Sequence, residues 1–194
     1  MNALQLQHLL ERLSSLLQSE NRARLNQYGL QTVQFEALHY LSICNRYSNT
    51  PKAVAEYLGL TKGTVSQSIK VLENKGFLVK NQDRKDKRIT RLQITASGED
   101  LVKLLTPSPL LTSYCEQAQQ GEPEAIVDHL TSLLRQIQTQ HQHKTFSQCH
   151  SCRHNQKLGE GEFFCQLTQE PLSATEVELI CIEHEPKARN NGAQ

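Results

Sequence analysis

Four cysteines near the carboxyl-terminal end of this 194-residue chain have the spacing of metal ligands. Cys149 and Cys152 form a Cys-x-x-Cys pair, Cys165 follows after twelve further residues, and Cys181 follows after fifteen more. The segment around them is otherwise polar and rich in Glu, Gln and His, so chance burial of four thiols in a core is not expected. In a reducing compartment, four thiolates satisfy either a tetrahedral zinc ion or an iron–sulfur cluster. The sequence therefore predicts one metal centre held by these four cysteines, which is either structural or a sensor of redox state or metal.

The identity of the metal stays open at this point. Zinc ribbons usually carry two Cys-x-x-Cys pairs, whereas the third and fourth thiols here stand alone. Disulfide bonds are the alternative use of the four thiols, and His150, His154 or His184 could replace a ligand. Because the segment contains few apolar residues, metal binding is expected to supply its folding free energy. Of the two remaining cysteines, Cys44 is predicted to be a core residue, and Cys115 is expected to be exposed enough to react.

A second group of residues, in the middle of the chain, has the chemistry of DNA contacts. A helix is predicted between Thr61 and Gly76, with Val65, Ile69 and Leu72 on its inward face and polar residues on the other. Ser, Thr and Gln side chains bond to base edges, while Lys and Arg reach phosphates or guanine acceptors. The predicted DNA-binding residues on this helix and in the charged turn after it are Lys62, Thr64, Ser66, Gln67, Lys70, Arg84, Lys85, Lys87 and Arg88. Within that turn, Asp86 and Arg88 are also expected to pair with each other and brace it.

Two short helices and a hairpin must position these side chains. Thr50 and Pro51 begin a helix that ends at Gly59, and Thr61 caps the helix that follows. Strand-forming stretches at 77–80 and 89–94 enclose the charged turn and predict a hairpin with a basic tip. This arrangement is a winged helix-turn-helix, whose second helix enters the major groove while the hairpin reaches the minor groove.

The segments on either side are predicted to be helical. Leucines at three- and four-residue steps predict an amphipathic helix over 6–17, and further helices are expected at about 32–47, from Ser97 to Leu105, and from about Pro123 to Ile137. Pro107 and Pro109 are expected to break or bend the chain between the last two. The terminal helices have little left to pack on once the middle domain binds DNA, so we expect them to form a dimer interface.

These elements give a mainly α fold (α+β) with five predicted regions. They are an N-terminal dimerisation helix (1–30), a winged helix-turn-helix DNA-binding domain (31–98), C-terminal dimerisation helices (99–143), a small four-cysteine metal-binding module (144–186) and a flexible tail (187–194).

The distribution of charge agrees with this division. Residues 51–103 contain eleven Lys and Arg against six acidic residues, whereas residues 115–194 contain six against eleven. A basic middle favours a polyanionic partner. No apolar run approaches the roughly 20 residues of a membrane span, and the first residues carry no basic signal region, so a cytoplasmic protein without membrane contact is expected. Without a phosphate-binding glycine loop, a Gly-x-Ser-x-Gly turn or a His-Glu-x-x-His motif, no enzymatic activity is expected.

The chain resembles the MarR family of bacterial regulators. The likeness covers about residues 1–140 and combines an Asp-x-x-Asp-x-Arg turn with a following strand and a Thr-x-x-Gly motif; its segments are Leu38–Leu41, Val54–Thr61, Val65–Ile69, Leu72–Val79, Asp83–Arg88 and Leu92–Gly98. The resemblance implies a homodimer with intertwined first and last helices. Such a dimer would bind a pseudo-palindromic operator on double-stranded DNA, usually as a repressor relieved by a small-molecule or redox effector. It assigns no function to the cysteine segment. The alternative is a protein-interaction adaptor whose cysteine module docks a partner and whose DNA binding is non-specific.

Overall fold

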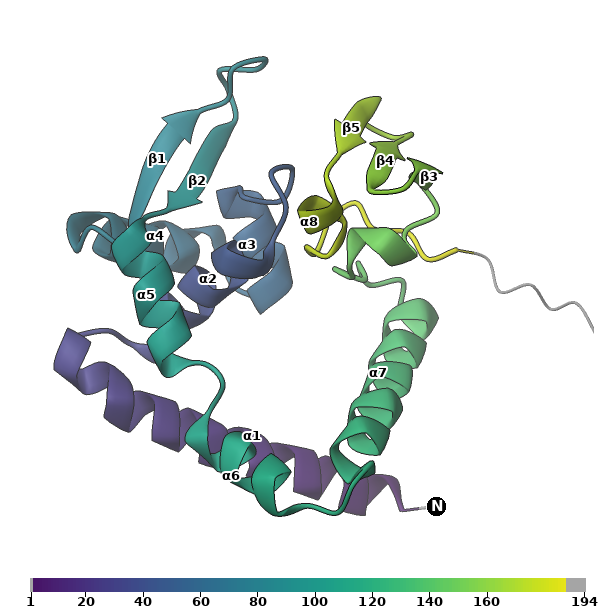
Figure 1. Cartoon of the computed structure of the whole chain (residues 1–194). Helices are drawn as coiled ribbons and strands as arrows, with labels where there is room; N and C mark the ends of the chain where they lie inside the picture. Colours follow the sequence, from purple (N-terminus) through teal and green to yellow (C-terminus); the bar gives the residue numbers. More distant parts are fainter. Residues whose placement is uncertain (1, 188–194) are drawn as a thin grey trace, which may run out of the picture.

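The computed structural model describes residues 2–187. They form a winged-helix core, with long helical arms below it and a small cysteine-rich unit beside it in the view of Figure 1. The helices are α1 (Ala3–Leu25), α2 (Thr32–Ile43), α3 (Pro51–Leu58), α4 (Lys62–Asn74), α5 (Ala96–Leu105), α6 (Pro109–Gln117), α7 (Glu122–Gln140) and α8 (Ala174–Val177), with short 3₁₀ turns at Asn26–Tyr28 and Cys149–Ser151. The strands are β1 (Leu78–Gln82), β2 (Thr90–Ile94), β3 (Asn155–Gly159), β4 (Glu162–Cys165) and β5 (Glu170–Leu172). Apart from Lys187, the predicted tail lies outside the described residues. None of the described helices combines the length and the hydropathy of a bilayer span.

The helix-turn-helix forms where the caps predict it. The Thr50 hydroxyl accepts a hydrogen bond from the Ala53 amide at 3.2 Å, and the Thr61 hydroxyl accepts one from the Thr64 amide at 3.2 Å. Gly59 has φ 64°, which lets the chain leave α3 in the left-handed conformation. The apolar faces of α2 to α5 are buried together with Leu78 and Leu92 of the hairpin in one hydrophobic core. These helices and their inward faces are confirmed.

The hairpin that forms the wing is antiparallel, with Leu78 opposite Ile94 and Gln82 opposite Thr90. The predicted strands are therefore correct in place, although β1 runs two residues further than 77–80. The predicted end of α2 at about Tyr47 is wrong. The helix ends at Ile43 because Cys44 is extended and forms a parallel bridge with Ile180, so the backbone there bonds to a distant segment.

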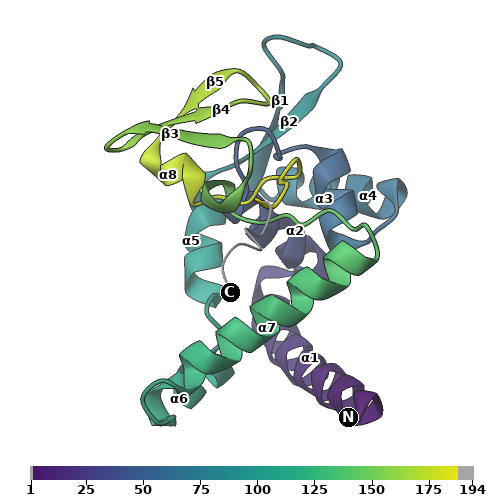
Figure 2. The same cartoon turned by 90° about the vertical axis from the view of Figure 1, so that its right-hand side faces the viewer.

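The arms consist of α1, α6 and α7, which extend away from the winged-helix core (Figures 1 and 2). Pro109 does not only break the chain, as expected, but occupies the first turn of α6, where a missing amide costs nothing. Neither α6 nor α7 contains a buried residue, and α1 buries only Leu25. The apolar side chains of the arms are thus left exposed in the single chain.

The cysteine module, residues 144–186, contains the three-stranded antiparallel sheet β3-β4-β5 and α8. The sequence predicts a separate unit that follows the dimerisation helices. In the structure it packs against the winged-helix core: Ile182 is part of the main hydrophobic core, and Phe146 and Ile180 lie against it. The module is therefore an integral neighbour of the winged helix (Figure 2).

Candidate nucleic-acid interface and thiol site

The outward face of α4 carries most of the side chains predicted to contact DNA. Lys62, Ser66, Gln67 and Lys70 are exposed, because Val65, Ile69 and Leu72 take the inward positions. Thr64 is only partly exposed, and its hydroxyl lies 3.0 Å from that of Thr61 at the start of the helix. The helix therefore presents a polar surface of the kind that base edges and phosphates can contact.

The tip of the wing carries the other predicted contacts. Arg84, Lys85, Lys87 and Arg88 are all exposed. Arg88 forms the expected brace, with its Nε 3.0 Å and its Nη2 2.9 Å from the two carboxylate oxygens of Asp86. Arg88 thus has an intramolecular partner, as does Lys85, whose ammonium group contacts Glu170 of the cysteine module.

Asp83 organises the turn at the base of this tip. Its carboxylate accepts hydrogen bonds from the amides of Asp86 (3.0 Å) and Lys85 (2.8 Å) and from Arg91 Nε (2.7 Å). These bonds, that from the Asp86 amide foremost, lower the pKa of Asp83 to about 2. Arg91 also donates to the carbonyl oxygen of Arg46 at 2.9 Å. The wing is therefore fixed to the loop between α2 and α3.

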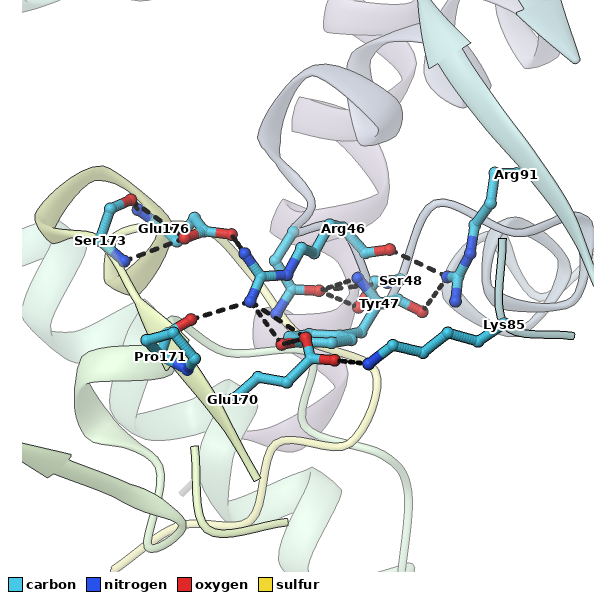
Figure 3. A network of polar contacts seen from close by, with 10 residues as sticks. Arg46, Tyr47, Ser48, Lys85, Arg91, Glu170, Pro171, Ser173 and Glu176 are labelled. Atoms are coloured by element: carbon cyan, nitrogen blue, oxygen red, sulfur yellow. Dashed lines mark hydrogen bonds and ion pairs between the residues drawn. The ribbon is translucent and has the colours of Figure 1, made fainter. Parts of the chain in front are cut away.

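A polar network joins this loop and the wing to the cysteine module (Figure 3). Glu170 accepts hydrogen bonds from Lys85, from the Tyr47 hydroxyl (2.7 Å) and from Arg46 (3.2 Å). The bond from Lys85, followed by that from Tyr47, lowers the pKa of Glu170 to about 2. Arg46 also donates to Glu176 at 2.6 Å. No local pattern in the sequence indicates this network, because its members are separated by up to 130 residues along the chain.

The four predicted metal ligands come together around one small cavity. Cys149, Cys152, Cys165 and Cys181 are buried, free of disulfide bonds, and line the same cavity of about 20 Å³. Burial and the neighbouring thiols raise the pKa of Cys149 to about 12. As the thiols stand, no three His, Cys, Asp or Glu side chains within residues 2–187 are arranged as a ready set of metal ligands. The four cysteines thus line one cavity, but the side chains of the described residues do not form a metal-ligand set there.

The remaining wall of this cavity contains unpaired polar atoms. In the described part of the chain, three buried side-chain atoms have no hydrogen-bond partner: Asn45 Nδ2, Asn155 Oδ1 and Thr168 Oγ1. All three residues line the cysteine cavity. Buried polar atoms are normally bonded, so the wall of this cavity has unused hydrogen-bonding capacity.

The three histidines considered as substitute ligands lie in different places. His154 lines the cavity, whereas His150 is exposed. His184 is buried, but its two ring nitrogens contact the hydroxyls of Thr145 and Ser151. Of the other cysteines, Cys44 is buried in the core, as predicted, and Cys115 is exposed. Burial raises the pKa of Cys44 to about 12, which disfavours a reactive thiolate there.

The two capped helices, the exposed polar face of α4 and the basic hairpin together define a winged helix-turn-helix protein. Comparison with known proteins gives the family. A family model described as the MarR family matches residues 28–89. An uncharacterised HTH-type transcriptional regulator of Bacillus subtilis, YwaE, is 30% identical over 120 residues, which cover 58% of this chain and 64% of the relative. A similar regulator of Bacillus cereus is 30% identical over 108 residues, 55% of this chain and 70% of its own. The chain belongs to the MarR family of winged-helix transcriptional regulators.

Solved structures give the same fold. Staphylococcus aureus MepR in its DNA-binding conformation is 25% identical, with a TM-score of 0.58 over 68% of this chain and 98% of MepR. The MepR–DNA complex gives a TM-score of 0.56 over 67% and 96%. The regulator BldR of Sulfolobus solfataricus, 21% identical with a TM-score of 0.56 over 69% and 94%, shares the fold.

Proposed function

We propose that this protein is a DNA-binding transcription regulator, a repressor rather than an enzyme, that acts as a homodimer on a pseudo-palindromic operator. The observation that carries the proposal is the exposed polar face of α4 beside a basic wing tip. In this geometry α4 enters the major groove and the wing reaches the adjacent minor groove. The similarity to MepR, one of whose structures is a DNA complex, supports the same use of these elements.

The arms support the homodimer. Large apolar side chains are exposed on three helices: Leu6, Leu9, Leu13 and Leu16 on α1, Leu110, Leu111 and Tyr114 on α6, and Ile126, Val127, Leu130, Leu134 and Ile137 on α7. Such extended apolar surface marks an interface, because a monomer rarely exposes it. A second copy of the chain is the proposed partner at this surface, since a dimer with two-fold symmetry matches a palindromic DNA site.

Operator binding is tested with duplexes selected from a random-sequence library by the purified full-length protein. We expect Gln67→Ala to relax the preference at one base position by about 1–3 kcal/mol. Lys70→Ala should weaken binding to all duplexes and reduce the slope of log affinity against log salt concentration by about 1. Lys103→Ala, which removes an exposed lysine of α5, is the matched control. Failure to enrich any sequence would favour the adaptor alternative.

We also propose that the cysteine cavity holds one zinc ion. Two of the unpaired atoms around it, Asn45 Nδ2 and Thr168 Oγ1, are donors that suit negatively charged sulfur. Four cysteine thiolates are a standard ligand set of a structural zinc ion. A bound divalent cation would keep the thiols deprotonated and join the module's 3₁₀ turn, β4 and the strand-like segment at Cys181.

Metal analysis of the purified protein tests this proposal. We expect about one zinc per chain by mass spectrometry and no visible absorption, and loss of zinc in Cys149→Ser and Cys181→Ser. Cys115→Ser, at an exposed thiol outside the cavity, should retain the metal. Equal amounts of iron and acid-labile sulfide would show a cluster instead, and a metal-free protein with four intact thiols would refute the centre.

A further inference from the structure

The Glu170 carboxylate lies where two cations of the winged helix meet. It accepts hydrogen bonds from Lys85 at the wing tip and from Arg46 in the loop between α2 and α3 (Figure 3). The pKa of Glu170, lowered to about 2, means that the group is an anion at neutral pH. Two cationic side chains converging on one anionic oxygen group are also the usual protein contacts of a DNA phosphate.

We propose that Glu170 is an internal substitute for a DNA phosphate, so that the docked cysteine module and the DNA backbone compete for Lys85 and Arg46. The inference rests on the proposed DNA binding and adds Arg46 to the interface. The module thereby restrains DNA binding as long as Glu170 is held against the wing.

The position of Glu170 depends on the cysteine cavity. Glu170 begins β5, and it pairs directly with Cys165 of β4. Pro171, the next residue, accepts a hydrogen bond from Arg46 at 2.8 Å. The carboxylate is therefore presented to the wing by a strand that is fixed to one of the four cysteines.

The contact is suited to competition because it is exposed. The side chain of Lys85 is 81% exposed and that of Arg46 43% exposed. Ion pairs at such positions contribute little to stability and are screened by salt. A strong, buried pair would hold the wing permanently, whereas this pair can be exchanged for a phosphate.

Removing the charge of Glu170 with a side chain of the same shape tests the direction of the competition. Glu170→Gln should bind duplex DNA about three- to tenfold more tightly near 0.1 M salt. Its affinity should also fall more steeply with salt, because each DNA phosphate that Lys85 or Arg46 becomes free to contact adds about 0.9 to the slope of log affinity against log salt concentration. Glu162→Gln removes the same charge from β4 of the same sheet and is the matched control. Glu162 forms no ion pair within residues 2–187, and its substitution should leave affinity nearly unchanged.

Both variants are measured on an enriched operator and on a random-sequence duplex. An effect of Glu170→Gln on the random duplex supports the competition even if no operator is found, so the two proposals can fail separately. Equal gains in the two variants would show a general charge effect and would overturn the inference. Weaker binding by Glu170→Gln, or no binding of the wild type to either duplex, would also overturn it.

Hydrogen exchange gives a second readout on the wild-type protein. Addition of duplex should increase exchange at the amides of β5, since Glu170 must leave the wing when phosphate arrives. Unchanged protection of β5 in the complex would mean that DNA binds with the module docked, and would exclude competition.

Discussion

At the scale of single residues, the side chains that touch DNA or metal are easier to predict than those that hold them in place. Lys62, Gln67 and Cys165 belong to local patterns that a single stretch of sequence displays. Arg46 and Glu170 belong to no such pattern, because these two hydrogen-bonded residues lie 124 residues apart in the sequence. Their roles come from tertiary contacts between polar groups, which are not determined by periodicity or local spacing.

Asn45 illustrates such a residue. Its Oδ1 accepts hydrogen bonds from Tyr47 N (3.2 Å), Ser48 N (3.1 Å) and Ser48 Oγ (2.7 Å), while its Nδ2 is unpaired in the wall of the cysteine cavity. Asn45→Asp keeps these acceptors but replaces the donor that faces the thiols with an anionic oxygen. We expect zinc affinity to fall about 10–100-fold, the usual cost of losing a partner of the ligand shell.

Competition with a chromophoric chelator measures that affinity, and Asn81→Asp on the exposed face of β1 is the control. Unchanged zinc affinity in Asn45→Asp would show that its amide does not support the thiolates. Thermal unfolding in excess chelator measures the destabilisation that a carboxylate at the buried position 45 causes without metal, so that the effect on zinc affinity can be separated from it.

At the scale of elements, caps and prolines predicted the helix starts well, but the small strands of the cysteine module were not foreseen. Thr50, Thr61 and Thr95 each cap the helix that follows by a side-chain hydrogen bond. The strands β3 to β5 are only three to five residues long and do not alternate polar with apolar residues, so they lack the pattern that marks a half-buried strand. Their pairing depends on tertiary context.

The junction between the wing and α5 is a tightly packed element boundary that substitution can test. A Cβ added to Gly98 would overlap the Phe77 carbonyl oxygen and stand 2.8 Å from Ile94 Cγ1, so α5 would have to move. We expect Gly98→Ala to lower the free energy of unfolding by about 1–3 kcal/mol. Gly63→Ala in α4, where the nearest atom is 3.8 Å away, should instead raise it by about 0.5–1 kcal/mol. Urea unfolding measures both, and changes of the same sign would contradict this packing.

The wing turn has a predicted response to acid. The pKa of Asp83 lies at about 2 in the folded turn, against an ordinary value of 3.8. Because the folded-state pKa is lowered, the stabilisation by Asp83 is fully present above the ordinary value and is lost as pH falls through the folded one. The amide NMR signals of Lys85 and Asp86 should therefore be constant down to about pH 4 and shift as the pH falls towards the folded-state pKa of about 2. Asp83→Asn should remove this acid step; a step that persists in that variant would assign it to another group.

At the scale of the whole molecule, the arms are the part that a single chain leaves incomplete. The double substitution Leu9→Glu with Leu13→Glu places two charges among the exposed leucines of α1. It should prevent dimerisation, because these charges would have to be buried in the interface. Light scattering is expected to give the mass of one chain, 22.0 kDa, for this variant and twice that mass for the wild type. The pair Val79→Glu with Leu158→Glu, at exposed positions of the wing and the module, should stay dimeric. A wild type with the mass of one chain would refute the dimer.

Residues 180–182 are hydrogen-bonded to the loop after α2, and this limits how far the protein can be shortened. Ile180 exchanges backbone hydrogen bonds with Ile43 and Asn45, and the Ile182 amide donates to the Ser48 hydroxyl at 2.8 Å. A version cut after α7 would expose those backbone groups and the core residues that Ile182 covers. The carboxyl-terminal segment is thus not a detachable accessory, and any attempt to graft it onto another regulator must bring a compatible loop with it.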